Sequence, residues 1–111
     1  LKEKELTKKR REGEKKILEN YSVFSDLRDK GHIVKQALKF GADFRVYHRG
    51  NSPGKNHAEW LCFIVRESDK ISWQEFAGKN RISHSTKKKL LIAIVDEEHD
   101  VSYYEVDWKR I

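Results

Sequence analysis

The amino-acid sequence predicts one α/β domain in which a single mixed β-sheet is flanked by helices. With 111 residues, the chain is long enough for one modest hydrophobic core but not for two independent ones. Four segments have the length and composition of strands, and they lie at residues 43–47, 57–66, 90–95 and 101–108. Helical patterns precede the first segment and separate the second from the third. The order along the chain is therefore helix, strands, helix, strands.

The N-terminal segment, residues 1–20, carries many basic and acidic side chains at spacings of three and four and almost no apolar ones. Such mixed charge predicts a solvated helix supported by local ion pairs. A second, short helix is expected over residues 22–30, where Val23 and Leu27 stand four apart and Gly31 supplies a left-handed stop.

The first strand segment alternates Phe44 and Val46 with polar residues and Tyr47, and this period of two is typical of a strand. A polar loop, residues 48–56, follows it and is rich in turn-forming residues. The second segment is apolar throughout residues 60–65, which predicts a strand buried on both faces.

The pair Ser72 and Glu75 matches the capping-box pattern, so a helix should begin at Trp73 and end near Asn80. The third strand segment, LLIAIV, is an apolar run of strand length, and the fourth, VSYYEVDW, is rich in β-forming residues. The acidic tract between them, residues 96–100, is expected to be a turn.

A formal net charge of +6 suggests a polyanionic partner, because lysine and arginine release counterions from a phosphate backbone. No run reaches the roughly eighteen apolar residues of a membrane helix, and no signal-peptide pattern is present. We therefore expect no membrane association and a cytoplasmic location. The lone cysteine, Cys62, is expected to be a small core residue in a reducing compartment.

The residue pattern does not favour a metal or nucleotide site. A metal-dependent nuclease needs carboxylates grouped around a cation, and the acidic residues near the strand segments lack such spacing. One cysteine and five histidines show no zinc-finger or H-E-x-x-H spacing. No glycine-rich loop opens a helix to cradle phosphates. We expect no metal and no other cofactor.

Acid–base chemistry by side chains alone remains. Tyr47 closes one strand segment, His57 opens the next across the polar loop, and a lysine run, residues 87–89, precedes the third. Strand ends joined by loops are where side chains from distant chain positions converge. The residues alone leave two alternatives open: Tyr47 as an ordinary strand-end residue and the lysine run as a solvated turn.

Four stretches carry a resemblance to a known family: KFGADFRVY (39–47), NHAEWLCFIV (56–65), NRISHSTKKKLLIAIVD (80–96) and VSYYEVDW (101–108). They resemble the catalytic domain of the archaeal tRNA-intron endonucleases, which is related to the catalytic subunits of the eukaryotic splicing enzyme. The resemblance implies a catalytic domain over residues 22–111, preceded by a charged helical lead-in, residues 1–21. An RNA-contacting arm is the alternative role for that lead-in.

The family resemblance also assigns a catalytic trio. The family's tyrosine ends the strand after Gly-Ala-Asp-Phe, which corresponds to Tyr47, and its histidine precedes a small residue, which corresponds to His57 before Ala58. Its lysine follows a His-Ser-Val-Arg-like stretch, represented here by residues 84–87, and corresponds to Lys88.

The register of the lysine stays open at this stage, because Lys87 replaces the family's arginine and Lys89 is a third lysine in the run. His48 lies beside the implied catalytic tyrosine. We interpret it as a surface or RNA-contacting residue rather than as the catalytic histidine.

The family grips an extruded bulge base between two cationic or aromatic side chains, which the resemblance places at Arg81 and Trp108. The alternative for Trp108 is an edge tryptophan packed on the sheet. The family also pairs subunits along its last strand and inserts an acidic loop into a neighbouring subunit. The corresponding loop residues here are Asp96, Glu97, Glu98 and Asp100.

The implied activity is excision of introns from precursor tRNA at bulge–helix–bulge-like sites by metal-independent transesterification, leaving 2′,3′-cyclic phosphate and 5′-hydroxyl ends. The implied partners are precursor tRNA and other endonuclease subunits, either copies of this chain or a structural subunit. Homodimeric members carry a whole N-terminal domain before this one, so either that domain was removed or the chain is one piece of a heteromeric enzyme. Two alternatives are a non-catalytic RNA-binding subunit of the same complex and, unrelated to the resemblance, a DNA-binding or metal-dependent nuclease domain.

Overall fold

The computed structural model describes residues 2–51, 54 and 56–111. Within them, the elements follow one another as α1 (Lys2–Asp29), β1 (Val34–Gln36), the 3-10 helix η1 (Leu38–Phe40), β2 (Phe44–Val46), β3 (Trp60–Arg66), α2 (Trp73–Ser85), β4 (Lys89–Val95) and β5 (Val101–Val106).

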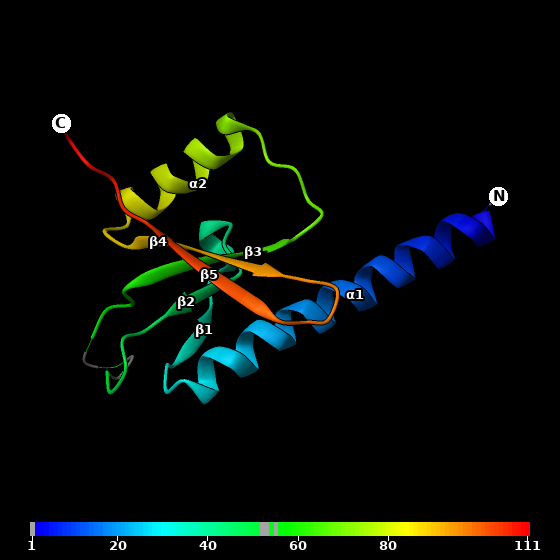
Figure 1. The fold of residues 1–111 in the computed structure, drawn as a ribbon, viewed down its shortest axis with the longest axis horizontal. Coiled ribbons are helices and arrows are strands. Elements are labelled where there is room, and N and C mark those ends of the chain that lie inside the picture. Colours follow the sequence, from blue (N-terminus) through cyan, green and yellow to red (C-terminus); the bar gives the residue numbers. More distant parts are fainter. Residues whose placement is uncertain (1, 52–53, 55) are drawn as a thin grey trace.

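The strands form one sheet in the order β1-β2-β3-β4-β5 (Figure 1). All neighbouring strands are antiparallel except β3 and β4, which run parallel from Trp60↔Lys89 to Arg66↔Val95. A parallel pair needs a long crossover connection, and α2 supplies it. The predicted α/β fold with a single mixed sheet is confirmed.

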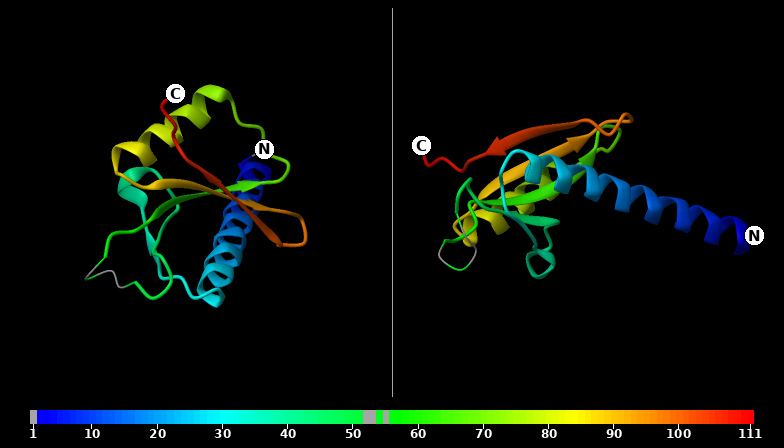
Figure 2. Two further views of the ribbon diagram at one scale, coloured as in Figure 1. Left: turned by 60° about the vertical axis from the view of Figure 1, so that its left-hand side comes forward. Right: turned by 90° about the horizontal axis from the view of Figure 1, so that it is seen from below.

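The two helices cover opposite faces of this sheet (Figure 2). On the α1 face, Val23 and Leu27 pack with Val46, Cys62 and Ala93. Cys62 is fully buried, as expected for a core residue, and its burial raises the pKa of its thiol. On the other face, η1 and α2 cover a second cluster, made of Ala37, Ala42, Leu61, Phe63 and Leu90 with Phe40 and Phe76 at its margin.

The expectation of two separate N-terminal helices was wrong. Helix α1 is continuous from Lys2 to Asp29 because no proline interrupts it and its last turns gain buried contacts through Val23 and Leu27. Gly31, at φ 93°, ends it as expected. The first half of α1 projects away from the sheet (Figure 1) and is exposed. The division between a lead-in and a catalytic domain stays a prediction.

Helix α2 begins where the capping box predicted, since Ser72 Oγ accepts a hydrogen bond from the Glu75 backbone N–H at 3.1 Å. It continues to Ser85, past the expected end at Asn80, because no helix-breaking residue follows and Ser83 is buried. No helix in the described part of the chain combines the length and apolarity needed to cross a bilayer.

Candidate active site

One end of the sheet brings together the chain positions singled out in the sequence. The pairs Val46↔Trp60, Trp60↔Lys89 and Leu90↔Val106 place the end of β2, the starts of β3 and β4 and the end of β5 side by side. Hydrogen bonds extend this row: the Glu59 N–H donates to Val46 O at 2.9 Å, and the Lys89 N–H donates to Glu59 O at 2.9 Å. We call this end of the sheet the site end. Tyr47, His57, Lys88 and Trp108 adjoin these strand ends.

Tyr47 is held at the site end through its backbone. Its N–H donates to Ile33 O at 3.0 Å, and its carbonyl oxygen accepts from His32 Nδ1 at 2.8 Å, so His32 carries a proton on that nitrogen. Phe44 and Val46 pack on the α1 face, so strand alternation directs Arg45 and Tyr47 to the opposite face. The Tyr47 side chain is only 5% exposed.

Lys88 reaches the same face as Tyr47. Leu90, two residues further on, belongs to the cluster beneath η1 and α2, and alternation assigns Lys88 to that side as well. The Lys88 Nζ lies 5.9 Å from the centroid of the Phe40 ring in η1 and donates to Thr86 O at 3.2 Å. Burial lowers the pKa of the Lys88 ammonium, and the charges of Arg45 and Lys39 lower it further.

The neighbouring lysines have different environments. Lys87 is exposed and adopts a left-handed backbone conformation, φ 59°, at the turn from α2 into β4. Lys89 points to the α1 face, where its Nζ lies 3.7 Å from Glu59 Oε1 and 3.8 Å from Glu105 Oε1. Of the three lysines, only Lys88 shares the face of Tyr47.

His57 precedes β3 and is exposed. Among the residues that the structure describes, no hydrogen bond or ion pair is assigned to its side chain. His48 is exposed as well, stacks on Trp60 with an interplanar angle of 15°, and places its Nε2 3.9 Å from Glu59 Oε2. The structure thus ties His48 to the α1 face and leaves the His57 imidazole accessible. Part of the loop between them, residues 52, 53 and 55, lies outside the described residues.

Arg81 and Trp108 lie near the C-terminal half of α2. Trp108 follows β5, is 50% exposed, and contacts the His84 ring of α2 at a centroid distance of 4.6 Å. Figure 1 shows this C-terminal segment running toward α2. Arg81 is exposed on α2 three residues before His84, so it lies one helical turn away on the same side of the helix.

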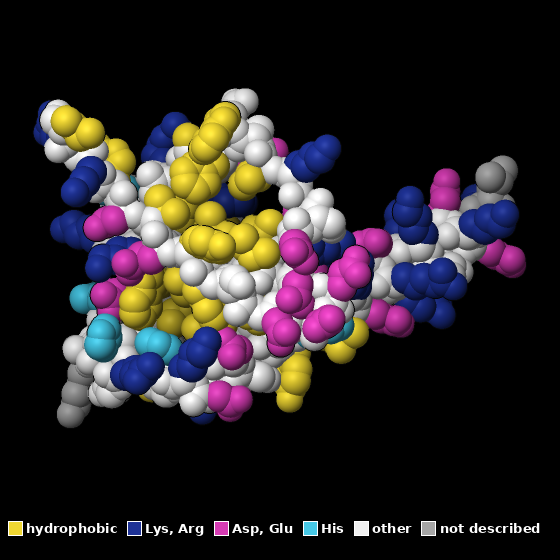
Figure 3. All heavy atoms as spheres, viewed as in Figure 1, with side chains coloured by type: hydrophobic (Ala, Val, Ile, Leu, Met, Phe, Trp, Pro, Cys, Tyr) yellow, Lys and Arg dark blue, Asp and Glu magenta, His cyan; other side chains and the backbone are white. Residues whose placement is uncertain are grey.

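The acidic loop lies at the far end of the sheet, where β4 turns into β5, and Figure 3 shows acidic side chains gathered there. Asp96 Oδ1 accepts from the N–H groups of Glu98 and Asp100, both at 2.9 Å. Asp96 therefore holds the expected turn together. Glu97, Glu98 and Asp100 are exposed.

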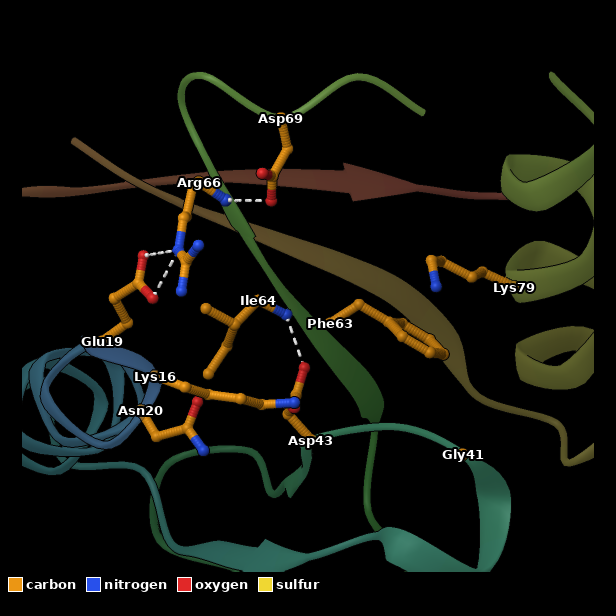
Figure 4. Close-up of a pocket in the computed structure, with 10 residues that line it drawn as sticks. All are labelled: Lys16, Glu19, Asn20, Gly41, Asp43, Phe63, Ile64, Arg66, Asp69 and Lys79. Atoms are coloured by element: carbon orange, nitrogen blue, oxygen red, sulfur yellow. Dashed lines mark hydrogen bonds and ion pairs between the residues drawn. The ribbon is translucent and has the colours of Figure 1, made fainter. Parts of the chain in front are cut away.

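A cavity of about 340 Å³ lies between α1, β3 and α2, away from the site end (Figure 4). Arg66 lines this cavity and pairs with two glutamates of α1. Its Nε lies 2.8 Å from both carboxylate oxygens of the buried Glu19, and its Nη1 lies 2.9 Å from Glu12 Oε2. Asp43 accepts the Ile64 N–H there at 2.7 Å. These bonds hold α1 and the start of β2 against β3, so we interpret the cavity as structural.

Sequence reasoning missed Lys39, Phe40 and Arg45 as neighbours of Lys88. The strand alternation already placed Arg45 on the face of Tyr47, but the position of η1 over that face could not be read from the sequence. Within the described residues, no three His, Cys, Asp or Glu side chains form a group that could hold a metal ion.

Comparison with known proteins bears on the family of this chain. Residues 17–103 match the family model described as tRNA intron endonuclease, catalytic C-terminal domain. Proteins named tRNA-splicing endonuclease are similar to the chain: 44% identical in Methanothermobacter thermautotrophicus, 46% in Pyrococcus furiosus and 40% in Nanoarchaeum equitans. The matches cover 88%, 81% and 99% of this chain and 58%, 51% and 74% of those relatives. The chain thus spans about half the length of the first two. It belongs to the tRNA-intron endonuclease family, whose catalytic C-terminal domain it carries.

Proposed function

We propose that this chain supplies the active site of an endonuclease that excises introns from precursor tRNA at bulge–helix–bulge-like sites. The reaction is metal-independent transesterification: the ribose 2′-oxygen attacks the adjacent phosphorus and the 5′-oxygen of the next nucleotide leaves. The observation that carries the proposal is the site end, to which three strand ends bring Tyr47, His57 and Lys88. The backbones of β2 and β4 lie two inter-strand spacings apart there, about 10 Å, a separation suited to a phosphate between Tyr47 and Lys88.

In this proposal Tyr47 accepts the proton of the 2′-hydroxyl as general base. The two backbone bonds of Tyr47, to Ile33 and His32, support the role because a general base must be held in position.

His57 donates the proton that the leaving 5′-oxygen needs, since imidazole titrates near neutral pH. Its exposure beside the start of β3 supports contact with a bound strand. Lys88 stabilises the charge that develops on the non-bridging oxygens, a contribution that is usually the largest electrostatic one. Lys89 is less suited to this role, because Glu59 and Glu105 already neutralise it.

Arg81 and Trp108 are proposed to hold an extruded base, and stacking of this kind contributes about 1–3 kcal/mol per base. The active form is proposed to be an assembly, either of copies of this chain or with a structural subunit. The outer edge of β5 is open in the described sheet, and an open edge can pair with another strand. The acidic residues Glu97, Glu98 and Asp100 would meet a basic surface of another subunit.

Cleavage of a labelled intron-bearing precursor tRNA by the full chain, in EDTA, tests the proposal. We expect two cuts, with 2′,3′-cyclic phosphate and 5′-hydroxyl ends identified by their sensitivity to phosphatase and kinase treatment. Loss of cleavage in EDTA with recovery in magnesium would overturn the mechanism. Tight RNA binding without cleavage, in every assembly that the chain forms, would favour a non-catalytic RNA-binding subunit.

A further inference from the structure

Two lysine ammonium groups lie beside the Phe40 ring, and an arginine charge acts on one of them. The ammonium groups of Lys39 and Lys88 lie 5.0 and 5.9 Å from its centroid. Arg45 projects from β2 to the face of the sheet that Lys88 also occupies. Its charge and that of Lys39 both lower the pKa of Lys88. We call Lys39, Arg45 and Lys88 the Phe40 cation cluster.

The cluster has no anionic counterpart in the part of the chain that the structure describes. Its only assigned hydrogen bonds go to neutral carbonyl oxygens: Arg45 Nε donates to Gln36 O at 3.0 Å, and Lys88 Nζ donates to Thr86 O. Three cations elsewhere on the described chain do have carboxylate partners: Arg66 pairs with Glu19, Lys30 with Asp26 and Lys89 with Glu59. Like charges gathered without a carboxylate destabilise one another, and a bound anion would remove that cost.

The neighbouring positive charges affect the ionisation of Lys88. Its pKa is lowered first by burial and then by the charges of Arg45 and Lys39. A single scissile phosphate engages Lys88 and leaves the other two charges of the cluster uncompensated. Arg45 stands two residues, about 7 Å, before Tyr47 along β2 and on the same face of the sheet, so its guanidinium is placed to meet the phosphate next to the one that Tyr47 and Lys88 would hold.

We propose that Lys39 and Arg45 form a second phosphate subsite, which binds the RNA phosphate adjacent to the scissile one. This inference rests on the proposed function. The arginine guanidinium presents a planar fork that matches two phosphate oxygens, and the lysine adds a flexible point charge. The subsite fixes the register of the strand, so that the scissile phosphate lies between Tyr47 and Lys88.

The first experiment measures binding of an uncleavable RNA, with a 2′-deoxyribose at the attacking nucleotide, across a range of salt concentrations. We expect Arg45→Gln and Lys39→Gln each to reduce the slope of log affinity against log salt by about 0.7–0.9, the loss of one phosphate contact. Arg45→Lys should retain the slope, because it keeps the charge. Lys70→Gln is the matched control, since Lys70 is exposed beyond the far end of β3 and should leave the slope unchanged.

The second experiment replaces single phosphates next to the cleavage site with uncharged methylphosphonates. At one of these positions the replacement and Arg45→Gln should weaken binding by the same factor, and combining them should add little, because both remove one contact. Fully additive losses at every position, or variants with wild-type salt slopes, would overturn the second subsite. If wild-type protein binds no precursor tRNA at all, the proposed function fails instead. Melting curves identify any variant that is unfolded, and Lys39→Gln and Arg45→Lys keep the test decisive if Arg45→Gln does not fold.

Discussion

Three consecutive lysines at the start of β4 occupy three different environments. Lys87 forms the left-handed turn, Lys88 lies half-buried beside Phe40, and Lys89 pairs with carboxylates on the opposite face. Consecutive side chains of an extended chain point to opposite faces of the sheet. Assigning the catalytic role to the next lysine would therefore move it to the other face. The chemistry proposed here depends on Lys88 sharing the face of Tyr47.

Replacement of each lysine by alanine should therefore separate them. Lys88→Ala should reduce single-turnover cleavage by about 10²–10⁴-fold, whereas affinity for uncleavable RNA should fall by no more than the loss of one phosphate contact, because the interaction strengthens in the transition state. Lys87→Ala and Lys89→Ala should change the cleavage rate by less than about tenfold. If Lys89→Ala is the damaging change instead, the assignment is displaced by one residue.

The pH dependence of Lys88 is a second expectation at this scale. Burial comes first among the causes that lower its pKa, and the repulsion from Arg45 adds to it, so removing that charge should raise the pKa. Lys88 should then keep its proton to higher pH in Arg45→Gln than in the wild type. An NMR titration of the Lys88 ammonium measures this directly, with Lys70→Gln as the control. A titration midpoint that moves downward, or stays in place, would contradict the arrangement.

Among the elements, α2 is stabilised at both ends by bonds that belong to single residues. Ser72 caps its N-terminus through the bond to the Glu75 N–H. At its C-terminus, Lys88 N–H donates to Ser83 O at 2.8 Å across the left-handed Lys87. Because α2 leads directly into Lys88, the way the helix ends sets the direction of the proposed catalytic lysine.

Ser72→Ala should destabilise the protein by about 1 kcal/mol, because the helix loses its N-cap. For a chain of this length that corresponds to a fall of about 4 °C in Tm. Ser85→Ala, at the other end of the same helix, removes only a bond to Ile82 O at 3.0 Å and should cost less than about 0.5 kcal/mol. Equal shifts in the two melting curves would show that the cap is unimportant.

The sequence predicted the elements that have strong local patterns and missed those that depend on tertiary contacts. The capping box located the start of α2, and the apolar runs located β3 and β4. Strand β1 was missed because only Val34 of its three residues is buried, and its pairing Val34↔Val46 depends on a partner distant in the chain. The break expected within α1 was wrong because packing of the helix against the sheet outweighs local preferences.

In the candidate site, too, the positions set by local patterns were predictable and those set by tertiary contacts were not. Register across antiparallel and parallel neighbours brought Tyr47 and Lys88 to one end and one face, as the strand-end argument and the family resemblance anticipated. The contribution of Lys39 was not predictable, because it depends on how the chain turns at η1. The catalytic roles themselves stay predictions.

For the molecule as a whole, the proposed chemistry and the proposed association loop lie at opposite ends of the sheet. The site end contains the starts of β3 and β4, and the acidic loop follows the end of β4. A change in the loop should therefore leave the local structure of the site intact. Any effect of the loop on cleavage must then act through assembly.

Replacing Asp96, Glu97, Glu98 and Asp100 by asparagine or glutamine should shift the mass in analytical ultracentrifugation toward smaller species and reduce cleavage. Asparagine at position 96 keeps an oxygen that can accept the two backbone bonds of the turn, so the loop itself should persist. Glutamine in place of Glu3, Glu5 and Glu14, all exposed on α1, is a control that also removes acidic charges. Unchanged mass and unchanged cleavage in the loop variant would mean that the loop is only a turn.

Side chains at the site end are proposed to carry the proton transfers, and His57→Ala removes the proposed proton donor. Two substrates are compared in single turnover: ordinary precursor tRNA and one whose leaving 5′-oxygen is replaced by sulfur. A thiol titrates near pH 8.5, against about 15.7 for water, so the sulfur leaves without a donated proton. We predict that the His57→Ala variant cleaves ordinary RNA about 10²–10⁴-fold more slowly than the wild type. The same variant should cleave the sulfur substrate at nearly the wild-type rate. The Tyr47→Phe variant should be slow on both substrates. Equal impairment of His57→Ala on the two substrates would show that His57 does not donate a proton to the leaving oxygen.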